Sequence, residues 1–129
     1  DPQALSVAVS ASLAAERIGL PEAQIILSQA ASYVACAPKS NASYMAIQNA
    51  MENVNTTRTM PVPVHLQDRH YKGAAKLGHG EGYKYAHDYP KHYVKQQYLP
   101  DGMEGTVFYE PSDNGYEKQI KAHMKWLKD

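Results

Sequence analysis

The amino-acid sequence predicts an all-α protein, in which a helical bundle is followed by a long irregular segment after residue 54. The first observation behind this fold class is an alanine-rich, weakly charged first half, whose apolar residues recur at the helical steps of three and four. The second is the placement of Gly and Pro between these apolar stretches, where they end helices. The third is another amphipathic pattern over residues 113–128.

The first helix is expected over residues 3–18, because this stretch contains neither Gly nor Pro and is rich in residues that favour helix. Gly19 is well placed to cap its carboxyl end. The stretch is apolar on most of its sides, which predicts that the helix is largely buried.

A second helix is expected to begin near Pro21 and to end at Pro38. Its apolar residues keep the helical period and place Cys36 on the apolar face, which predicts a packed, unreactive thiol. A third helix follows a cap at Ser40 or Asn41. Because three helices joined by short turns are typical of an antiparallel bundle, residues 1–54 are predicted to form a three-helix platform. The apolar stripe of the third helix consists of Tyr44, Ile47, Met51 and Val54.

Residues 55–112 are predicted to be irregular and rich in tyrosine. Residues 61–65 are expected to be extended because of their two prolines, and residues 68–77 to form a short helix that stops at Gly78. A short extended piece is expected at residues 106–109. The final helix is expected over residues 113–128, and the three parts together are predicted to form one domain. The apolar stripe of the final helix consists of Tyr116, Ile120, Met124 and Leu127.

Composition excludes several classes of protein. The chain has 129 residues, with 13 basic and 13 acidic side chains, so it carries neither a strongly basic nucleic-acid arm nor an acidic tail. Its single cysteine rules out an internal disulfide framework and fits a reducing, cytoplasmic compartment. The apolar residues 4–15 are too few and too interrupted by serine for a membrane span. A chain that starts Asp1-Pro2 is expected to be a piece of a longer protein.

Motifs for catalysis are missing from the sequence. Neither GxGxxG nor GxxxxGK[ST] occurs, and the glycine cluster at residues 78–82 carries Glu81, which would repel a phosphate. No GxSxG is present either. The chain alone is therefore not expected to hydrolyse a nucleotide.

The histidines leave a metal site as a distant alternative, which would make the chain an independent metal hydrolase. The two His pairs are spaced by five residues rather than the four that would place both ligands on one helical face. Four ligands would have to converge from loops, so hydrogen-bonded loop histidines are favoured. The residues concerned are His65, His70, His87 and His92, with Asp68 and Asp88 nearby.

Residues 83–98 interleave tyrosines with lysines, a pattern that binds single-stranded nucleic acid in other proteins. The same pattern suits a protein interface, or a loop that packs its rings on the bundle. The zero net charge favours the last two interpretations, while a module that binds single-stranded DNA or another partner stays open as the alternative function. Its candidate residues are Tyr83, Lys84, Tyr85, Lys91 and Lys95.

Two long runs of residues and several shorter ones follow one another along the chain. The longest runs are Tyr33–Ala42 (YVACAPKSNA) and Gly80–Asp88 (GEGYKYAHD), and shorter ones are Glu16–Ala23, Val62–Leu66, Tyr98–Pro100, Phe108–Pro111 and Trp126–Leu127. From about residue 15 to residue 127, these runs resemble the C-terminal region of the replication-associated recombination protein A family, also called MgsA, whose eukaryotic relative is the Werner helicase-interacting protein.

The resemblance implies a fold similar to the clamp-loader collar and a role in oligomerisation, as a tetramer. It places an AAA+ ATPase module, with its ATP and Mg²⁺, before Asp1, and it assigns no catalytic, cofactor or metal residue to this chain. The intact proteins of the family act at stalled replication forks in DNA replication, recombination and repair. The resemblance therefore implies DNA and single-stranded DNA-binding protein as partners, and a bacterial, cytoplasmic, nucleoid-associated location.

An assembly domain needs an apolar surface that a lone chain would leave exposed. The two apolar stripes of the third and final helices are the candidates for this surface. Both stripes could equally form the core, which is the commoner fate of such patterns. The candidate interface residues are Tyr44, Ile47, Met51, Ile120, Met124 and Leu127.

Overall fold

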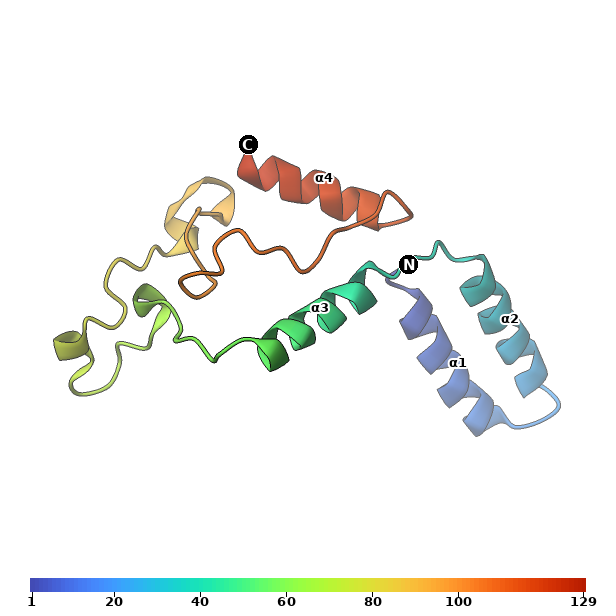
Figure 1. Cartoon of the computed structure of the whole chain (residues 1–129). Coiled ribbons are helices and arrows are strands. Elements are labelled where there is room, and N and C mark those ends of the chain that lie inside the picture. Colours follow the sequence, from blue (N-terminus) through green and yellow to red (C-terminus); the bar gives the residue numbers. More distant parts are fainter. The chain divides into compact units, whose positions relative to one another are not determined.

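The computed structural model describes all 129 residues and contains four α-helices and no β-strand, which confirms the all-α prediction (Figure 1). The chain divides into two compact units, one formed by residues 1–41 and 111–123 and the other by residues 42–110 and 124–129. No helix is long and apolar enough to cross a membrane. The helices are α1 (Ala4–Ile18), α2 (Ala23–Cys36), α3 (Ala42–Thr56) and α4 (Glu117–Lys128).

The first unit is built on the antiparallel hairpin of α1 and α2, which lie side by side in Figure 1. The two helices approach through a seam of small side chains, and the buried residues of the hairpin are all alanines. Gly19 ends α1 as predicted, with φ at +78° and its N–H donated to the carbonyl of Ala15 at 2.9 Å. The buried alanines are Ala11, Ala23 and Ala30.

Lys39 caps the carboxyl end of α2. Its ammonium donates to the carbonyl oxygens of Ala35 at 2.8 Å, Ala37 at 3.2 Å and Val34 at 3.4 Å. The last carbonyls of a helix have no partner within the helix, and the negative end of the helix dipole attracts a cation. One lysine therefore satisfies the end of α2 just before the chain turns into the next segment.

The turn before α4 contacts the segment that follows α2. The Asn114 side-chain amide donates to the carbonyl of Lys39 at 3.1 Å, and a methyl group on Gly115 would lie 2.7 Å from Cβ of Pro38. Gly115 also has φ at +51°, so the turn occupies residues that were expected to start the helix. As a result α4 begins at Glu117, whose carboxylate accepts the N–H of Ser112 at 2.8 Å.

The second unit contains α3 and four short 3-10 turns. Of the helix predicted over residues 68–77 only the last part forms, as a 3-10 turn that stops at Gly78 as predicted; the left-handed φ of +99° at Gly73 prevents the longer helix. The extended stretch predicted at residues 61–65 ends early, since the first turn begins at Val64. The turns are Val64–Leu66, Ala74–Leu77, Ala86–Asp88 and Pro90–His92. Residues 106–109 form no strand, and the buried apolar side chains of this unit are Pro63, Ala74 and Val94.

Exposure of apolar side chains contradicts two predictions. The first helix is not largely buried, because only Ala11 of α1 is buried while Leu5 is 75% exposed. Cys36 is exposed rather than packed. The physical reason is the same in both cases: an alanine seam covers one narrow face of each helix, and nothing else in the first unit covers the others. The predicted three-helix platform stays a prediction, since α3 belongs to the second unit.

Gly115→Ala is expected to destabilise the first unit more than Gly102→Ala destabilises the second. Both glycines have positive φ, which costs an alanine about 1 kcal/mol. Only Gly115 meets a neighbour, and its overlap with Pro38 should add a further ~1–3 kcal/mol. The measurement is the free energy of urea unfolding followed by helical circular dichroism. Equal losses for the two variants would contradict the contact between Gly115 and Pro38.

Candidate functional site

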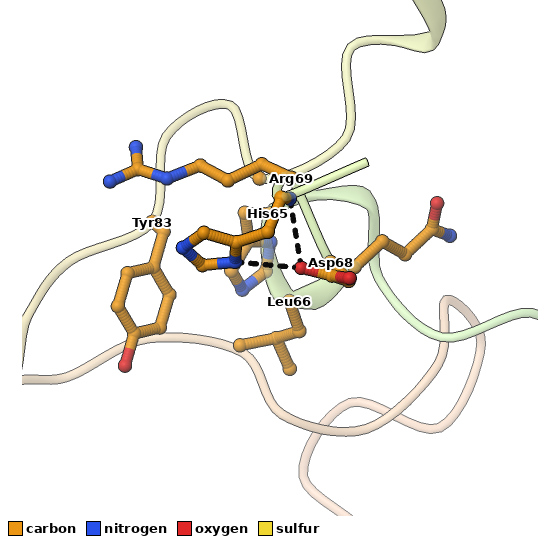
Figure 2. A pocket seen from close by; sticks show the side chains of 8 residues that line it. His65, Leu66, Asp68, Arg69 and Tyr83 are labelled. Carbon is orange, nitrogen blue, oxygen red and sulfur yellow. Dashed lines mark hydrogen bonds and ion pairs between the residues drawn. The ribbon is translucent and has the colours of Figure 1, made fainter. Parts of the chain in front are cut away.

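A pocket of about 300 Å³ lies in the second unit, between the first 3-10 turn and the glycine-rich loop (Figure 2). It combines two imidazoles, a guanidinium, a carboxylate, a phenol ring and one apolar side chain. Its volume lies at the lower end of the range of ligand sites. The lining residues are His65, Leu66, Gln67, Asp68, Arg69, His70, Gly80 and Tyr83.

Asp68 organises the chain at the edge of this pocket. Its Oδ1 accepts the backbone N–H of His70 at 2.9 Å and the Nδ1–H of the His70 ring at 2.8 Å, marked in Figure 2. The backbone bond, and then the ring bond, hold the pKa of Asp68 below its ordinary value. Asp68 is therefore ionised at neutral pH, and it fixes both the turn and the orientation of the His70 ring.

The His65 ring is held by a residue from a later part of the sequence. Its Nε2 lies 2.7 Å from the carbonyl oxygen of Gln97. Because a carbonyl oxygen only accepts, Nε2 carries the proton and donates, which leaves Nδ1 free to accept in the neutral ring. The ring thus holds residues 65 and 97 together and is itself half-buried.

Gly80 lets two parts of the pocket come close. Its N–H donates to the carbonyl of Val64 at 2.8 Å. A methyl group on Gly80, whose φ is +75°, would lie 3.1 Å from both Cβ and Cδ of Arg69. The Arg69 stem therefore lies on the bare backbone of Gly80, and the guanidinium forms no ion pair with a carboxylate of this chain.

The five nucleic-acid candidates do not share one site. The Lys91 ammonium donates to the carbonyl of Trp126 and lies 4.6 Å from the centre of the indole, so it is already engaged. The Tyr85 ring contacts the His87 ring at a tilt, with ring centres 5.1 Å apart. Lys84 pairs through its backbone with the Gln96 side chain, and Lys95 is exposed outside the pocket. Tyr83 alone lines the pocket.

Three of the loop histidines are hydrogen-bonded. His65 and His70 have the partners described above, and Nδ1 of His79 lies 2.6 Å from the Tyr71 hydroxyl. The rings of His87 and His92 contact each other at a tilt, with ring centres 5.2 Å apart. No group of three or more His, Cys, Asp or Glu side chains is arranged to hold a metal ion.

The two apolar stripes differ in exposure. On α3, Tyr44, Ile47 and Met51 are 62%, 55% and 50% exposed. The residues of the α4 stripe are half-buried within the chain, and they are Ile120, Met124 and Leu127. Only the α3 stripe is left open to solvent over its whole length.

Sequence reasoning did not nominate Arg69 for a site or Lys39 for the cap of α2. The spacing of Asp68 and His70 was a usable signal, because aspartate commonly binds the backbone N–H two residues later and forms a turn. Arg69 carried no such signal, since its place depends on the fold that brings Gly80 beneath its stem.

His70→Ala is expected to raise the pKa of Asp68 part of the way to its ordinary value, since the ring bond is lost and the backbone N–H stays. Because the folded pKa is lowered, the stabilisation of this turn is present above pH ~4 and is lost as the pH falls through the folded pKa. Carboxyl ¹³C NMR titration measures the pKa. His79→Ala is the control, because that ring binds Tyr71. An unchanged Asp68 pKa in His70→Ala would contradict the described bond.

Comparison with known proteins identifies the chain at the level of its family. The chain is 42% identical over 121 residues to replication-associated recombination protein A of Bacillus subtilis, covering 93% of this chain and 29% of that protein. It is 37% identical over 128 residues to the Escherichia coli protein of that name, covering 98% of this chain and 29% of that protein. ATPase WRNIP1 of Dictyostelium discoideum is 32% identical over 111 residues, which cover 85% of this chain and 13% of that protein.

The chain thus spans less than a third of the length of these relatives, and the matched part is their C-terminal region. Residues 1–128 match the family model described as the MgsA AAA+ ATPase C terminal. This chain therefore belongs to the MgsA AAA+ ATPase C-terminal family, as the runs at residues 33–42 and 80–88 predict.

Proposed function

We propose that this chain is the oligomerisation region of an AAA+ ATPase that acts in replication-fork maintenance and recombination, and that it assembles with copies of itself into a tetramer. Membership of an AAA+ ATPase C-terminal family and likeness to replication-associated recombination proteins support the role of the parent protein. The observation that carries the assembly role is the amount of apolar surface that the chain leaves uncovered.

The exposed area can be compared with that of compact domains. The chain exposes 10291 Å². Two separate compact domains with the masses of the two units would together expose about 8,200 Å². The excess of about 2,000 Å² is larger than the ~800 Å² that each partner buries in a standard protein interface. A surface of this size supports a stable partner, and interfaces between copies of one chain are the more apolar kind.

The α3 stripe is the proposed centre of the interface. Tyr44, Ile47 and Met51 are exposed at steps of three and four, so they form one face of the helix. Large aromatic and aliphatic side chains on one face are what a helix needs to pack against a second helix. The α4 stripe is half-buried within its own chain, so it has less surface to contribute.

The chemistry of the parent protein belongs, in this proposal, to the ATPase module with its ATP and Mg²⁺. The chain carries no phosphate-binding motif, and Cys36 is an exposed thiol that belongs to no metal-binding group. DNA and single-stranded DNA-binding protein are proposed partners of the whole protein. A collar-like arrangement of the copies is proposed on the family resemblance.

Light scattering during gel filtration tests the assembly role. The chain is expected to form a homo-oligomer at tens of micromolar, and Ile47→Glu is expected to dissociate it, because a charge would be buried in the interface. Gln48→Glu is the matched control, since it adds the same charge at an adjacent exposed position of α3. This control should remain oligomeric.

Two outcomes would count against the proposal at different levels. A chain that stays strictly monomeric at tens of micromolar overturns self-association and leaves the ATPase module as what covers the apolar surface. An oligomer that survives Ile47→Glu as well as it survives Gln48→Glu overturns the assignment to α3 alone.

A further inference from the structure

The even charge of the whole chain hides a positive segment. Residues 64–98 carry six Lys or Arg and three Asp or Glu, so their net charge is +3. Residues 99–113 carry four acidic residues and no basic one. The pocket described above therefore lies in the part of the chain that attracts anions.

Arg69 is the cation best prepared to bind an anion there. Its stem rests on the backbone of Gly80, so closely that a methyl group there would lie 3.1 Å from Cβ and Cδ of Arg69 and would push the stem aside slightly. Its guanidinium has no carboxylate partner within the chain. A guanidinium presents a planar set of donors that matches two oxygens of a phosphate, and a stem held in place loses less entropy on binding.

Tyr83 offers a flat ring to the same pocket. Tyr83 is 48% exposed. It ends a turn in which its backbone N–H donates to the carbonyl of Gly80 at 3.4 Å. Gly80 thus supports the Arg69 stem and begins the turn that carries Tyr83. In Figure 2, Arg69 and Tyr83 lie on one side of the pocket and the Asp68 carboxylate lies on the other.

We propose that this pocket binds one nucleotide unit, with its base stacked on Tyr83 and its phosphate paired with Arg69. Stacking on an aromatic ring is tolerant of base identity, and it is combined with a cation in proteins that bind single strands. Asp68 and Glu81 would each repel a phosphate. Glu81 does not line the pocket, and Asp68 lies on the opposite side of the view and already accepts two hydrogen bonds from His70. A volume of about 300 Å³ suits one such unit.

This binding site does not depend on the proposed oligomerisation. It gives the chain a ligand in addition to the copies of itself. The same chemistry, a base with a phosphate, could come from a single-stranded nucleic acid or from a free nucleotide. The sequence alone pointed to residues 83–98 for such a role. The structure shifts the site toward residues 65–83 and replaces Lys91, which is held by Trp126, with Arg69.

Fluorescence anisotropy of a labelled oligothymidylate at low salt tests the proposal on the whole 129-residue chain. Arg69→Ala and Tyr83→Ala are each expected to weaken binding about tenfold. Arg69→Ala should also reduce the steepness of the salt dependence by about 0.7, because one phosphate contact is lost. Tyr83→Phe keeps the stacking ring and should bind like the unaltered chain.

Matched controls separate the pocket from general charge and general aromatic content. Lys72→Ala removes the same charge from an exposed position outside the pocket, and Tyr89→Ala removes an exposed ring outside it. Both should bind almost normally, and circular dichroism should show unchanged helix content in all variants. Equal losses in the pocket variants and the controls, or no binding by the unaltered chain, would overturn the site.

Competition distinguishes the two sources of the ligand. Thymidine monophosphate that displaces the strand at millimolar concentration, and loses this ability in Arg69→Ala, assigns the pocket to a free nucleotide as well. A strand that binds through Arg69 and Tyr83 without competition from the mononucleotide assigns it to single-stranded nucleic acid. A mononucleotide that binds equally well to the unaltered chain and to both pocket variants contradicts the proposal.

Discussion

The structure leaves apolar surface that no part of the chain covers. Both the stability of the chain and its proposed self-association depend on this surface. The hairpin of α1 and α2 packs through alanines, which bring the helices close but remove little apolar area from water. The larger apolar residues of α1, such as Leu5 and Val9, face away from the seam. Because the hydrophobic gain within the hairpin is small, the proposed self-association would add stability by covering these exposed apolar side chains.

In the first unit, hydrogen bonds fix the end of α2 and the turn before α4. Lys39 closes the end of α2 with three carbonyl contacts, and Asn114 reaches back over 75 residues to the Lys39 carbonyl. Each bond contributes only about 1 kcal/mol, yet together they fix where α2 ends and where the turn before α4 begins. The hydrogen bonds around Lys39 thus fix the positions of these two elements, while the apolar faces of the helices stay exposed.

The sequence predicted the helices better than their surroundings. Periodicity and the placement of Gly19 and Pro38 were sufficient for α1, α2 and α3, whose ends lie within a few residues of those expected. Periodicity cannot say what covers an apolar stripe, and so the burial expected for Cys36 was wrong. The helix expected after residue 68 failed for a different reason, because Gly73 within that stretch has a left-handed φ of +99° and only the 3-10 turn Ala74–Leu77 forms after it.

The residues of the candidate pocket were also predictable only in part, because a sequence pattern does not show which segments the fold brings together. Tyr83 stood out in the sequence as one ring in a run of rings and lysines, whereas Arg69 acquires its meaning from Gly80, eleven residues away. One stacked base and one phosphate contact give a weak site on a single chain. Assembly of several copies would place several such sites at a high effective concentration around one strand, so that avidity exceeds the affinity of each. The proposed self-association and the proposed nucleotide binding would thus reinforce each other, and neither needs a strongly basic arm.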